Sequence, residues 1–383
     1  MMKVCITRNA EARTNAAIAR IAHALEHAAD DVCLLTRNRY VNHYGKIKRL
    51  KYKISDKEIF NYEVRLKSTS RNGIFNILQL ILFQLILFIW LMKNKDKYDI
   101  IHAFDLDTGL PAFLVTVFAR KKYVYHIADF YVDSREHLPK SLKSIIRKLE
   151  HDVINKAEAT IICTEDREKQ IEGSHPKKLV VVHNTPMISK EVIDSVLRPE
   201  TDVPEPRQEI VFTYVGELNE RRFIKAAIDI IKKHSNVILN IAGMGKLAEY
   251  VEQAAKEYEN IRYFGIIDYG KALELYSKTD YMFAIYDPAV PNHKFSAPNK
   301  VYEAMLLGKP IIVAQGTGID RIVLNNAMGL VINYSEDNFE KTIKNILDNP
   351  FMGLQMAKNS KKAYASYSWH EMKSRIKNIY SHI

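Results

Sequence analysis

Residues 294–314, KFSAPNKVYEAMLLGKPIIVA, contain the repeating unit that decides the fold. Pro298 is typical of the first turn of a helix, and 299–307 carry apolar side chains at helical spacing. The run 310–314 that follows is a continuous apolar strand. A helix leading into a wholly apolar strand predicts one unit of a parallel sheet that is covered on both faces.

The same alternation of strand and helix runs through the whole chain. In the second half the expected strands are 210–215, 237–242, 261–264, 281–285, 310–314 and 330–332, and the expected helices lie near 221–234, 246–258, 269–277, 299–307, 318–325 and 335–348. In the first half the expected strands are 3–7, 31–35, 99–104, 123–128, 159–164 and 179–183, and the clearest helices are 14–29, 74–93 and 140–156. Each half therefore predicts a Rossmann-like α/β domain with a doubly wound parallel sheet.

The boundary between the halves is marked by 198–207, RPETDVPEPR, whose three prolines and mixed charge are typical of a linker. We therefore expect one domain at 1–197 and another at 208–366. The final helix, at 367–383, lies outside the second series, and we expect it to cross back to the first domain. Open α/β sheets bind ligands beyond the carboxyl ends of their strands, so two such domains predict a central cleft.

The composition, with 383 residues, 47% apolar and 26% charged, is that of a globular chain with a large core. It excludes collagen-like, low-complexity and solenoid-repeat proteins. The net charge of +11 predicts an anionic partner, either a phosphorylated substrate or acidic lipid. The basic residues are spread along the chain without an aromatic-basic module, which argues against a nucleic acid partner.

The three cysteines and the N-terminus predict a cytoplasmic protein. Cys5, Cys33 and Cys163 lie in apolar runs without zinc spacing, as expected for buried thiols in a reducing compartment. The first residues lead directly into a strand and show no signal-peptide pattern.

One segment, 74–92, has the length and composition of a bilayer span, because it carries no charge. Asn76, Gln79 and Gln84 would share one weakly polar face of a helix there. Crossing a membrane would separate the first two strands from the rest of their sheet. We therefore expect a helix packed on the sheet, whose basic ends touch anionic lipid at the inner face of the membrane.

The turn at 214–222, YVGELNERR, carries candidate anion-binding residues. Gly216 lets the backbone approach a ligand, and Arg221 and Arg222 are expected in the first turn of the next helix. Cations there oppose the helix dipole, so they either face solvent or bind an anion.

The stretch 294–314 carries a second set of candidates. Ser296 and Pro298 precede backbone N–H groups that are available to an anion, and Lys300 adds a positive charge. Glu303, one turn later, either accepts hydrogen bonds from a hydroxylated group such as ribose or pairs with Lys300 on the surface.

With these residues in view, the chain resembles the GT-B fold glycosyltransferases, particularly glycosyltransferase family 4. The motifs that carry the resemblance are YVGEL followed by Arg222, IAGMG at 241–245, YFG at 263–265, D-P at 287–288, SAPNKVYEAMLLGKPII at 296–312 and S-W at 368–369. The first half matches more loosely in YDIIHAFDLDTGLPA, KKYVYHIAD and VVVHNTP. The resemblance implies two Rossmann-like domains facing a cleft, a nucleoside diphosphate sugar as donor, and retention of anomeric configuration.

The resemblance also assigns roles to individual residues. Glu303 matches the glutamate that holds the nucleotide ribose, and Arg222 matches the cation that holds the pyrophosphate. Arg222 and Lys300 would stabilise the diphosphate leaving group, so no metal and no other cofactor is expected. The remaining donor-binding positions implied are Gly216, Arg221, Gly243, Gly265, Ser296, Pro298 and Asn299, with the backbone of 264–266 beside the base.

Three positions depart from the family pattern. Phe295 stands where the family commonly has the first of two glutamates, and this affects recognition of the sugar. Glu217 stands where a basic residue often follows the turn glycine, which weakens the pyrophosphate clamp unless Arg221 substitutes. Ala128 stands where a histidine commonly precedes the acidic residue, so that histidine's role does not transfer to this chain.

In the first domain, Asp129 is the expected catalytic residue that orients the acceptor. His102, Asp105 and His126 are further acceptor-side candidates, since they lie at or beyond strand ends. Carboxylates at such positions, including Asp107, are equally often ordinary caps.

Two other site classes are disfavoured. The first turn, Thr7-Arg-Asn-Ala-Glu11, lacks the glycines of a dinucleotide fingerprint, which argues against an NAD enzyme. His23 and His27 have metal-ligand spacing on a helix, but surface histidines of this kind are more often solvated or packed.

The sequence therefore predicts a metal-independent glycosyltransferase that moves a hexose-type sugar to a saccharide or lipid-linked glycan acceptor in surface polysaccharide synthesis. Two alternatives remain open. A nucleotide-sugar epimerase of the same fold would interconvert sugar nucleotides without an acceptor. A catalytically silent scaffold of a glycan assembly complex is compatible with the three departures.

Overall fold

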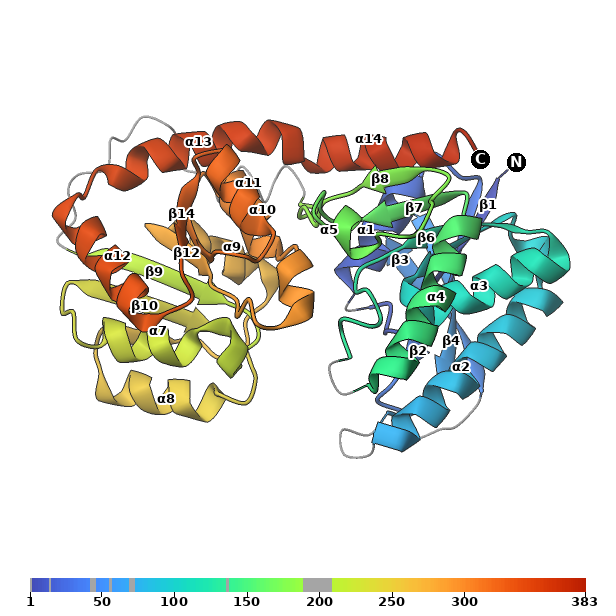
Figure 1. The fold of residues 1–383 in the computed structure, drawn as a ribbon, viewed down its shortest axis with the longest axis horizontal. Helices are drawn as coiled ribbons and strands as arrows, with labels where there is room; N and C mark the ends of the chain where they lie inside the picture. The colour runs from blue at the N-terminus through green and yellow to red at the C-terminus, as the bar shows by residue number, and fades with distance from the viewer. Residues whose placement is uncertain are drawn as a thin grey trace. The chain divides into compact units, whose positions relative to one another are not determined.

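The computed structural model describes residues 2–13, 15–41, 46–54, 57–68, 73–135, 138–188 and 209–383. The chain divides into two compact units, Met1–His183 with Met372–Ile383 (unit 1) and Asn184–Glu371 (unit 2) (Figure 1). The expected linker at 198–207 lies outside the described residues. Residues 184–188 belong to unit 2, because Asn184 donates to the Ala297 carbonyl (2.9 Å) and Thr185 to that of Tyr367.

Unit 2 is built on a parallel sheet whose described strands follow the order β11-β10-β9-β12-β13-β14. The strands are β9 (Ile210–Val215), β10 (Val237–Ala242), β11 (Ile261–Tyr263), β12 (Tyr281–Ala284), β13 (Ile311–Ala314) and β14 (Gly329–Ile332). Strands β10, β12 and β13 are buried along their whole length, as expected for continuous apolar runs, and each of the six strands lies within two residues of its predicted position. The strand order reverses between β9 and β12, as in doubly wound sheets, so the predicted fold class is confirmed for this unit.

The helices of unit 2 cover both faces of the sheet (Figure 1). One layer contains α7 (Ile224–Ile231), α8 (Ala248–Glu257) and α12 (Glu336–Asp348); the other contains α9 (Tyr269–Ser277), α10 (Asn299–Leu307), α11 (Ile319–Asn325) and α13 (Met352–Tyr367). The helix expected near 221–234 begins only at Ile224. Arg221 and Arg222 instead form a 3₁₀ turn, η2 (Glu220–Arg222), after which Phe223 adopts a left-handed conformation.

Unit 1 contains a sheet with the order β3-β4-β2-β1-β5-β6-β7-β8 among its described strands. The strands are β1 (Lys3–Arg8), β2 (Asp31–Asn38), β3 (Ile47–Ile54), β4 (Lys57–Arg65), β5 (Ile100–Phe104), β6 (Lys122–His126), β7 (Ala159–Ile162) and β8 (Leu179–Val181). The expectation of a wholly parallel sheet is wrong at one edge, where β3 runs antiparallel to β4. The alternating, lysine-rich β3 is largely exposed, as suits an edge strand, and a search for continuous apolar runs misses it.

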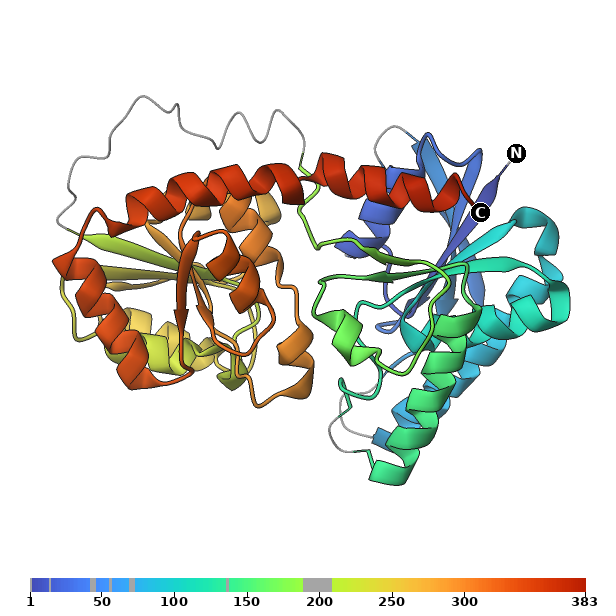
Figure 2. The ribbon, with the colours of Figure 1, turned by 45° about the horizontal axis from the view of Figure 1, so that its top comes forward.

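The helices of unit 1 are α1 (Ala16–Leu25), α2 (Gly73–Lys93), α3 (Asp105–Ala119), α4 (Lys140–Lys156), the short α5 (Arg167–Gln170) and the end of α14 (Trp369–Tyr380). Helices α2, α3 and α4 pack in sequence on one face. The last part of α14 lies along this unit (Figure 2). It is attached there by Arg375, which donates to the Val181 carbonyl (3.0 Å), and by Tyr380, whose hydroxyl lies 2.6 Å from His102 Nδ1.

Helix α2 packs one side against the core of unit 1, as expected, through Phe83 and Leu87. Gln79, from its weakly polar face, is buried on this same side. The exposed side is apolar and consists of Ile77, Leu78, Ile81, Leu82, Leu85 and Ile89, each between 42% and 59% exposed. The helix is long and apolar enough to cross a membrane, and 28% of its apolar window is buried within the protein.

Candidate functional site

The first two turns of unit 2 pack backbone against backbone beyond β9 and β10. Gly216 N–H donates to the Ala242 carbonyl (2.9 Å), and Leu218 N–H to that of Met244 (2.8 Å). A Cβ at Gly243 would lie 1.8 Å from the Gly216 carbonyl oxygen, and one at Gly245 would lie 2.2 Å from the Leu218 oxygen. The IAGMG glycines are therefore required by this close approach, which shapes the turn that the sequence assigned to the donor phosphates.

Lys300 extends from the first turn of α10 to the turn after β9. Its side chain is 8% exposed, and its Nζ lies 4.5 Å from the centre of the Tyr214 ring. A Cβ at Gly216 would lie 2.8 Å from this Nζ, so glycine makes room for the ammonium group. Burial lowers the pKa of Lys300, but the neighbouring phenols and the Glu303 carboxylate raise it more. The net shift is upward, and the side chain stays charged at neutral pH.

Arg222 approaches the same region from η2. Its guanidinium carbon lies 3.7 Å from the centre of the Tyr286 ring, and Tyr286 follows β12. Its Nη1 is buried and, within the described part of the chain, has no hydrogen-bond partner. A cation held over an aromatic ring keeps its donors available for a ligand, which a salt bridge would occupy.

Glu303 is 5% exposed and accepts a hydrogen bond from the Tyr269 hydroxyl (3.1 Å). It is therefore not the exposed partner of Lys300 that one interpretation of the sequence offered. Sequence reasoning missed Tyr269, which begins α9 directly after its N-cap Asp268. The one feature of the sequence that could have indicated a role for Tyr269 is its position just after the strand-end loop at 264–266. A side chain there can reach the neighbouring helix α10, where Glu303 lies.

The segment before α10 differs from the expectation in one respect. Pro298 is itself the N-cap, and Asn299 is the first helical residue, exposed to solvent. Ser296 does not cap this helix, because its hydroxyl donates to the His293 carbonyl (3.0 Å) and closes the preceding 3₁₀ turn. Proline has no side-chain oxygen that could cap the helix. The first N–H groups of α10 are therefore not occupied by a side-chain cap and are open to an anion.

Arg221 and Arg222 are adjacent but differ in their contacts. Arg221 Nη1 is ion-paired with Asp287, which is 8% exposed and also accepts from Ala289 N–H (2.9 Å). This pairing opposes the suggestion that Arg221 substitutes for the missing basic residue at position 217, where Glu217 is exposed.

Part of the backbone of the strand-end loop at 264–266 is hydrogen-bonded to β10 and the turn that follows it. Phe264 N–H donates to the Ile241 carbonyl (2.9 Å), and the Gly265 carbonyl accepts from Gly243 N–H (2.7 Å). Gly265 has φ +63° with nothing near its Cβ position, and the side chains of Phe264 and Ile266 are 45% and 73% exposed. The loop thus presents two apolar side chains at the edge where a base is expected.

In unit 1, His102 is a core residue rather than an exposed one. It is fully buried, and its two ring nitrogens face Tyr380 Oη (2.6 Å) and His126 Nδ1 (3.1 Å). Burial lowers the pKa of His102 to about 3 and that of His126 well below its usual value, so both rings are neutral at pH 7. These contacts fix the orientation of both histidines and leave His102 no surface for an acceptor.

Asp105 and Asp107 begin α3 instead of lying in a loop. Asp105 is left-handed (φ +54°), and its Oδ1 accepts from the backbone N–H groups of Ala128 (2.8 Å) and Asp129 (2.9 Å). Burial raises the pKa of Asp105 to about 6, against the opposing effect of Arg8. Asp105 thus positions the backbone of the segment that carries Asp129, whose own side chain is exposed.

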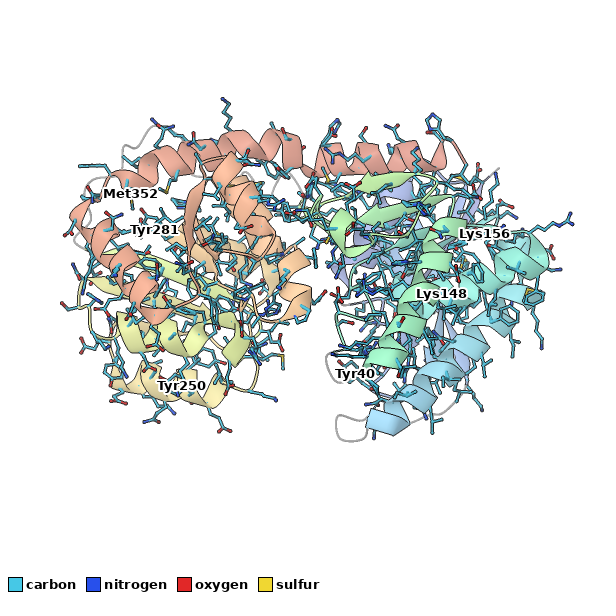
Figure 3. All side chains as sticks on the ribbon, in the orientation of Figure 1. Tyr40, Lys148, Lys156, Tyr250, Tyr281 and Met352 are labelled. Atoms are coloured by element: carbon cyan, nitrogen blue, oxygen red, sulfur yellow. The ribbon has the colours of Figure 1, made fainter. Side chains whose placement is uncertain are left out.

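The remaining candidates do not form a site. All three cysteines are buried and free, and His23 lies 4.0 Å from Glu26. No cluster of three or more His, Cys, Asp or Glu side chains suited to a metal occurs among the described residues. A cavity of ≈ 170 Å³ in unit 2 lies at the amino ends of its strands, near Tyr281 and the start of α13 at Met352 (Figure 3), away from the residues discussed above.

Comparison with known proteins shows which families the chain resembles. Residues 200–363 match the family model described as glycosyl transferases group 1. The chain is 22% identical over 203 residues to an uncharacterised glycosyltransferase of Methanocaldococcus jannaschii, a match that spans 50% of each protein. It is 24% identical over 305 residues, 76% of each chain, to the UDP-Gal:alpha-D-GlcNAc-diphosphoundecaprenol alpha-1,3-galactosyltransferase of Escherichia coli.

Among solved structures, the fold matches that of HepE from Anabaena in complex with UDP-glucose. The TM-score is 0.68 at 15% identity, and the match covers 100% of both chains. The predicted resemblance is thereby confirmed: the chain has the GT-B fold, and residues 200–363, less than half of it, match the family model of group 1 glycosyl transferases.

Proposed function

We propose that this protein transfers a hexose-type sugar from a UDP-sugar to a saccharide or lipid-linked glycan acceptor. The observation that carries the proposal is the arrangement around Gly216. Lys300, which is buried, lies at the Gly216 turn, Arg222 has a buried Nη1 without a partner among the described residues, and buried Glu303 lies one helical turn from Lys300. Two cations and a carboxylate in this order suit the diphosphate and ribose of a nucleotide sugar.

In the proposed reaction the diphosphate gains charge as its bond to the sugar breaks. Arg222 and Lys300 stabilise that charge, and the first N–H groups of α10 assist them. These groups do what a bound metal does in other transferases, so the proposed reaction is metal-independent. Retention of anomeric configuration belongs to the same proposal and rests on the family resemblance.

The relative from Escherichia coli, whose name gives UDP-Gal as donor and a diphosphoundecaprenol as acceptor, supports a UDP-sugar and a lipid-linked glycan. We therefore place the proposed reaction in surface polysaccharide synthesis.

A thermal-shift series tests the donor site. The purified chain is heated with UDP-, GDP-, dTDP- and CMP-sugars, since a ligand at 100 times its Kd stabilises by about 2.7 kcal/mol. UDP-sugars should raise the Tm of the wild type, and Glu303→Ala should lose the shift. Glu249→Ala, an exposed glutamate on α8, is the control and should keep it. No response to any nucleotide would overturn the proposal, and conversion of the sugar nucleotide without an acceptor would replace it with an epimerase.

We further propose that unit 1 binds the inner face of the cell membrane through the exposed apolar side of α2. Phe88 of α2 lies 6.1 Å, ring centre to ring centre, from Phe118 of α3, which is 67% exposed, so the apolar surface continues onto α3. Lys93, Lys95 and Lys97 are exposed at the C-terminal end of α2. Apolar side chains flanked by lysines suit an anionic bilayer, into whose surface such a helix can insert.

Flotation with vesicles tests this contact. The protein should float with vesicles containing phosphatidylglycerol and less with phosphatidylcholine alone, while Leu78→Glu/Leu85→Glu should remain in solution. Leu324→Glu, which changes a 60% exposed leucine of unit 2, should float like the wild type. A chain that stays unbound at low and high salt alike would refute the membrane contact.

A further inference from the structure

A cluster of arginines lies at the carboxyl ends of β1 and β2 in unit 1. Arg8 is the last residue of β1, Arg37 lies near the end of β2, and Arg39 follows it. Strand β1 is paired with β2 on one side and β5 on the other, so the chain order reverses at this point. In doubly wound sheets, ligands bind at such a reversal.

Asn9 holds the cluster together. Its Nδ2 donates to Asp107 Oδ2 (2.6 Å), its Oδ1 accepts from Arg37 Nη1 (3.4 Å), and its carbonyl accepts from Arg39 Nη2. Arg37 is also anchored through its Nε, which donates to the Leu66 carbonyl (3.1 Å). Arg8 stacks over Phe104, with 4.4 Å between the guanidinium carbon and the ring centre. The side chains are therefore fixed before any ligand arrives.

The hydrogen bonding of this cluster is incomplete. Arg8 Nη1, Arg37 Nη2, Arg39 Nε and Asp107 Oδ1 are all buried, and none has a hydrogen-bond partner within the described residues. Arg37 is 3% exposed and Asp107 is 9% exposed. A buried polar atom without a partner destabilises the folded protein, and more so when the group is charged. Four such atoms in one cluster indicate a ligand that supplies the missing partners.

The unpaired atoms define the chemistry of that ligand. Three guanidinium donors suit the oxygens of a phosphate, which arginine binds with matching planar geometry. The unpaired Asp107 oxygen needs a donor, which a phosphate dianion lacks and a sugar hydroxyl has. Burial, together with nearby Arg39, lowers the pKa of Arg37 to about 10, so it remains a cation at pH 7. A ligand with both phosphate and hydroxyl groups satisfies the whole cluster.

We propose that Arg8, Arg37 and Arg39 bind the phosphate of a phosphorylated saccharide acceptor, and that Asp107 accepts a hydrogen bond from one of its hydroxyls. The proposal rests on the transferase function proposed above and specifies its acceptor as an anionic sugar. The acceptor phosphate then carries no catalytic role and fixes the position of the saccharide.

Calorimetric titration tests the site with three probes, N-acetylglucosamine 1-phosphate, N-acetylglucosamine and inorganic phosphate. The sugar phosphate should bind more tightly than either of the other two. Arg37→Lys, which keeps the charge but loses the planar fork, should weaken it about 10- to 100-fold. Asp107→Asn should weaken the sugar phosphate but leave inorganic phosphate unchanged. Arg49→Ala, an exposed arginine of β3, is the matched control and should bind like the wild type.

UDP binding is measured on the same samples, so failure of this inference can be distinguished from failure of the proposed donor site. A wild type that binds UDP but not the sugar phosphate overturns the inference and leaves the proposed function standing. Equal affinity for inorganic phosphate, unaffected by Asp107→Asn, would reduce the cluster to a simple anion site and also overturn it. Vesicle flotation of Arg37→Lys should match the wild type, because a lipid headgroup is not the proposed ligand.

Discussion

The first turns of the two sheets occupy equivalent places, after β1 in unit 1 and after β9 in unit 2, and they are built differently. In unit 2, Gly216 leaves space that the Lys300 ammonium approaches. In unit 1 the corresponding positions are Arg8 and Asn9, whose side chains fill the space themselves. The same topology can thus bind a ligand through the backbone of a glycine turn, as proposed for unit 2, or through fixed side chains, as proposed for unit 1. The residue that distinguishes the two turns is Gly216.

The two edges also differ in how their cations are held. Arg222 and Lys300 lie over tyrosine rings, which leaves their hydrogen-bond donors for a ligand. In unit 1, Arg37 and Arg39 share a hydrogen-bond network with Asn9, which also donates to Asp107, and only Arg8 lies over a ring, that of Phe104. Cations over rings suit a highly charged diphosphate, whereas a mixed network suits a ligand that combines charge with hydroxyls.

The largest loss of stability and donor binding is expected from a substitution at Gly243, where two turns of unit 2 pack backbone against backbone. Gly243→Ala would place a Cβ 1.8 Å from the Gly216 oxygen, so the two turns must separate, at a cost of about 3 kcal/mol or more. Donor binding should disappear and the Tm should fall. Gly265→Ala is the control, because it meets no atom within 4 Å and costs only about 1–2 kcal/mol for its left-handed backbone. Equal effects of the two variants would show that the close approach of the turns is unimportant.

The second prediction removes the cation held by an aromatic ring. Arg222→Ala should lower the rate of sugar transfer about 10²- to 10³-fold, the usual effect of losing one group that stabilises developing charge. Tm should change little, because Nη1 has no partner to lose among the described residues. Lys225→Ala, an exposed lysine of α7, is the control. Full activity of Arg222→Ala would remove the central element of the proposed donor site.

The third prediction concerns a carboxylate of unit 1. Burial raises the pKa of Asp105 to about 6, above its unfolded value of about 3.8, so the folded state favours the protonated form. This residue's contribution to stability is therefore complete at low pH and is lost as pH rises from about 4 to 6.

Asp105→Asn removes that loss while keeping an oxygen for the Ala128 and Asp129 N–H groups. From pH 4 to pH 7, the stability of the variant relative to wild type should rise by about 2 kcal/mol. Urea unfolding at the two pH values measures the change, and Glu249→Gln should show none. A relative stability that is the same at both pH values would place the pKa of Asp105 near its ordinary value.

The sequence predicted most where one local pattern decides the outcome. Strands β10, β12 and β13 and the helix α10 were predicted within two residues, because their burial leaves little choice of side chain. The edge strand β3 was missed because an exposed strand needs no apolar run. The side of α2 that packs was left undecided, because a helix that is apolar almost all round gives no indication of which side packs.

The site residues that were missed depend on contacts between distant segments. Tyr269 reaches Glu303 across 34 positions, and Arg37 meets Asn9 from the neighbouring strand. His102 was taken for an acceptor residue because it lies near a strand end. Its burial is completed by Tyr380, 278 positions away, which no local pattern could indicate.

The smallest effect is expected at Arg221, which is more exposed than its neighbour Arg222 and is already ion-paired. Because Asp287 holds its guanidinium, Arg221→Ala should lower transfer less than about tenfold, mostly through release of an ion pair whose arginine is exposed and which is worth about 1 kcal/mol. Asp287→Asn should produce a similar small change, and the double variant should be no worse than either single one. If instead Arg221→Ala lowers the rate of sugar transfer as much as Arg222→Ala, Arg221 must leave Asp287 when the donor binds. In that case the ion pair does not keep Arg221 from the donor, and the proposed difference between an ion-paired cation and one held over a ring is wrong for unit 2.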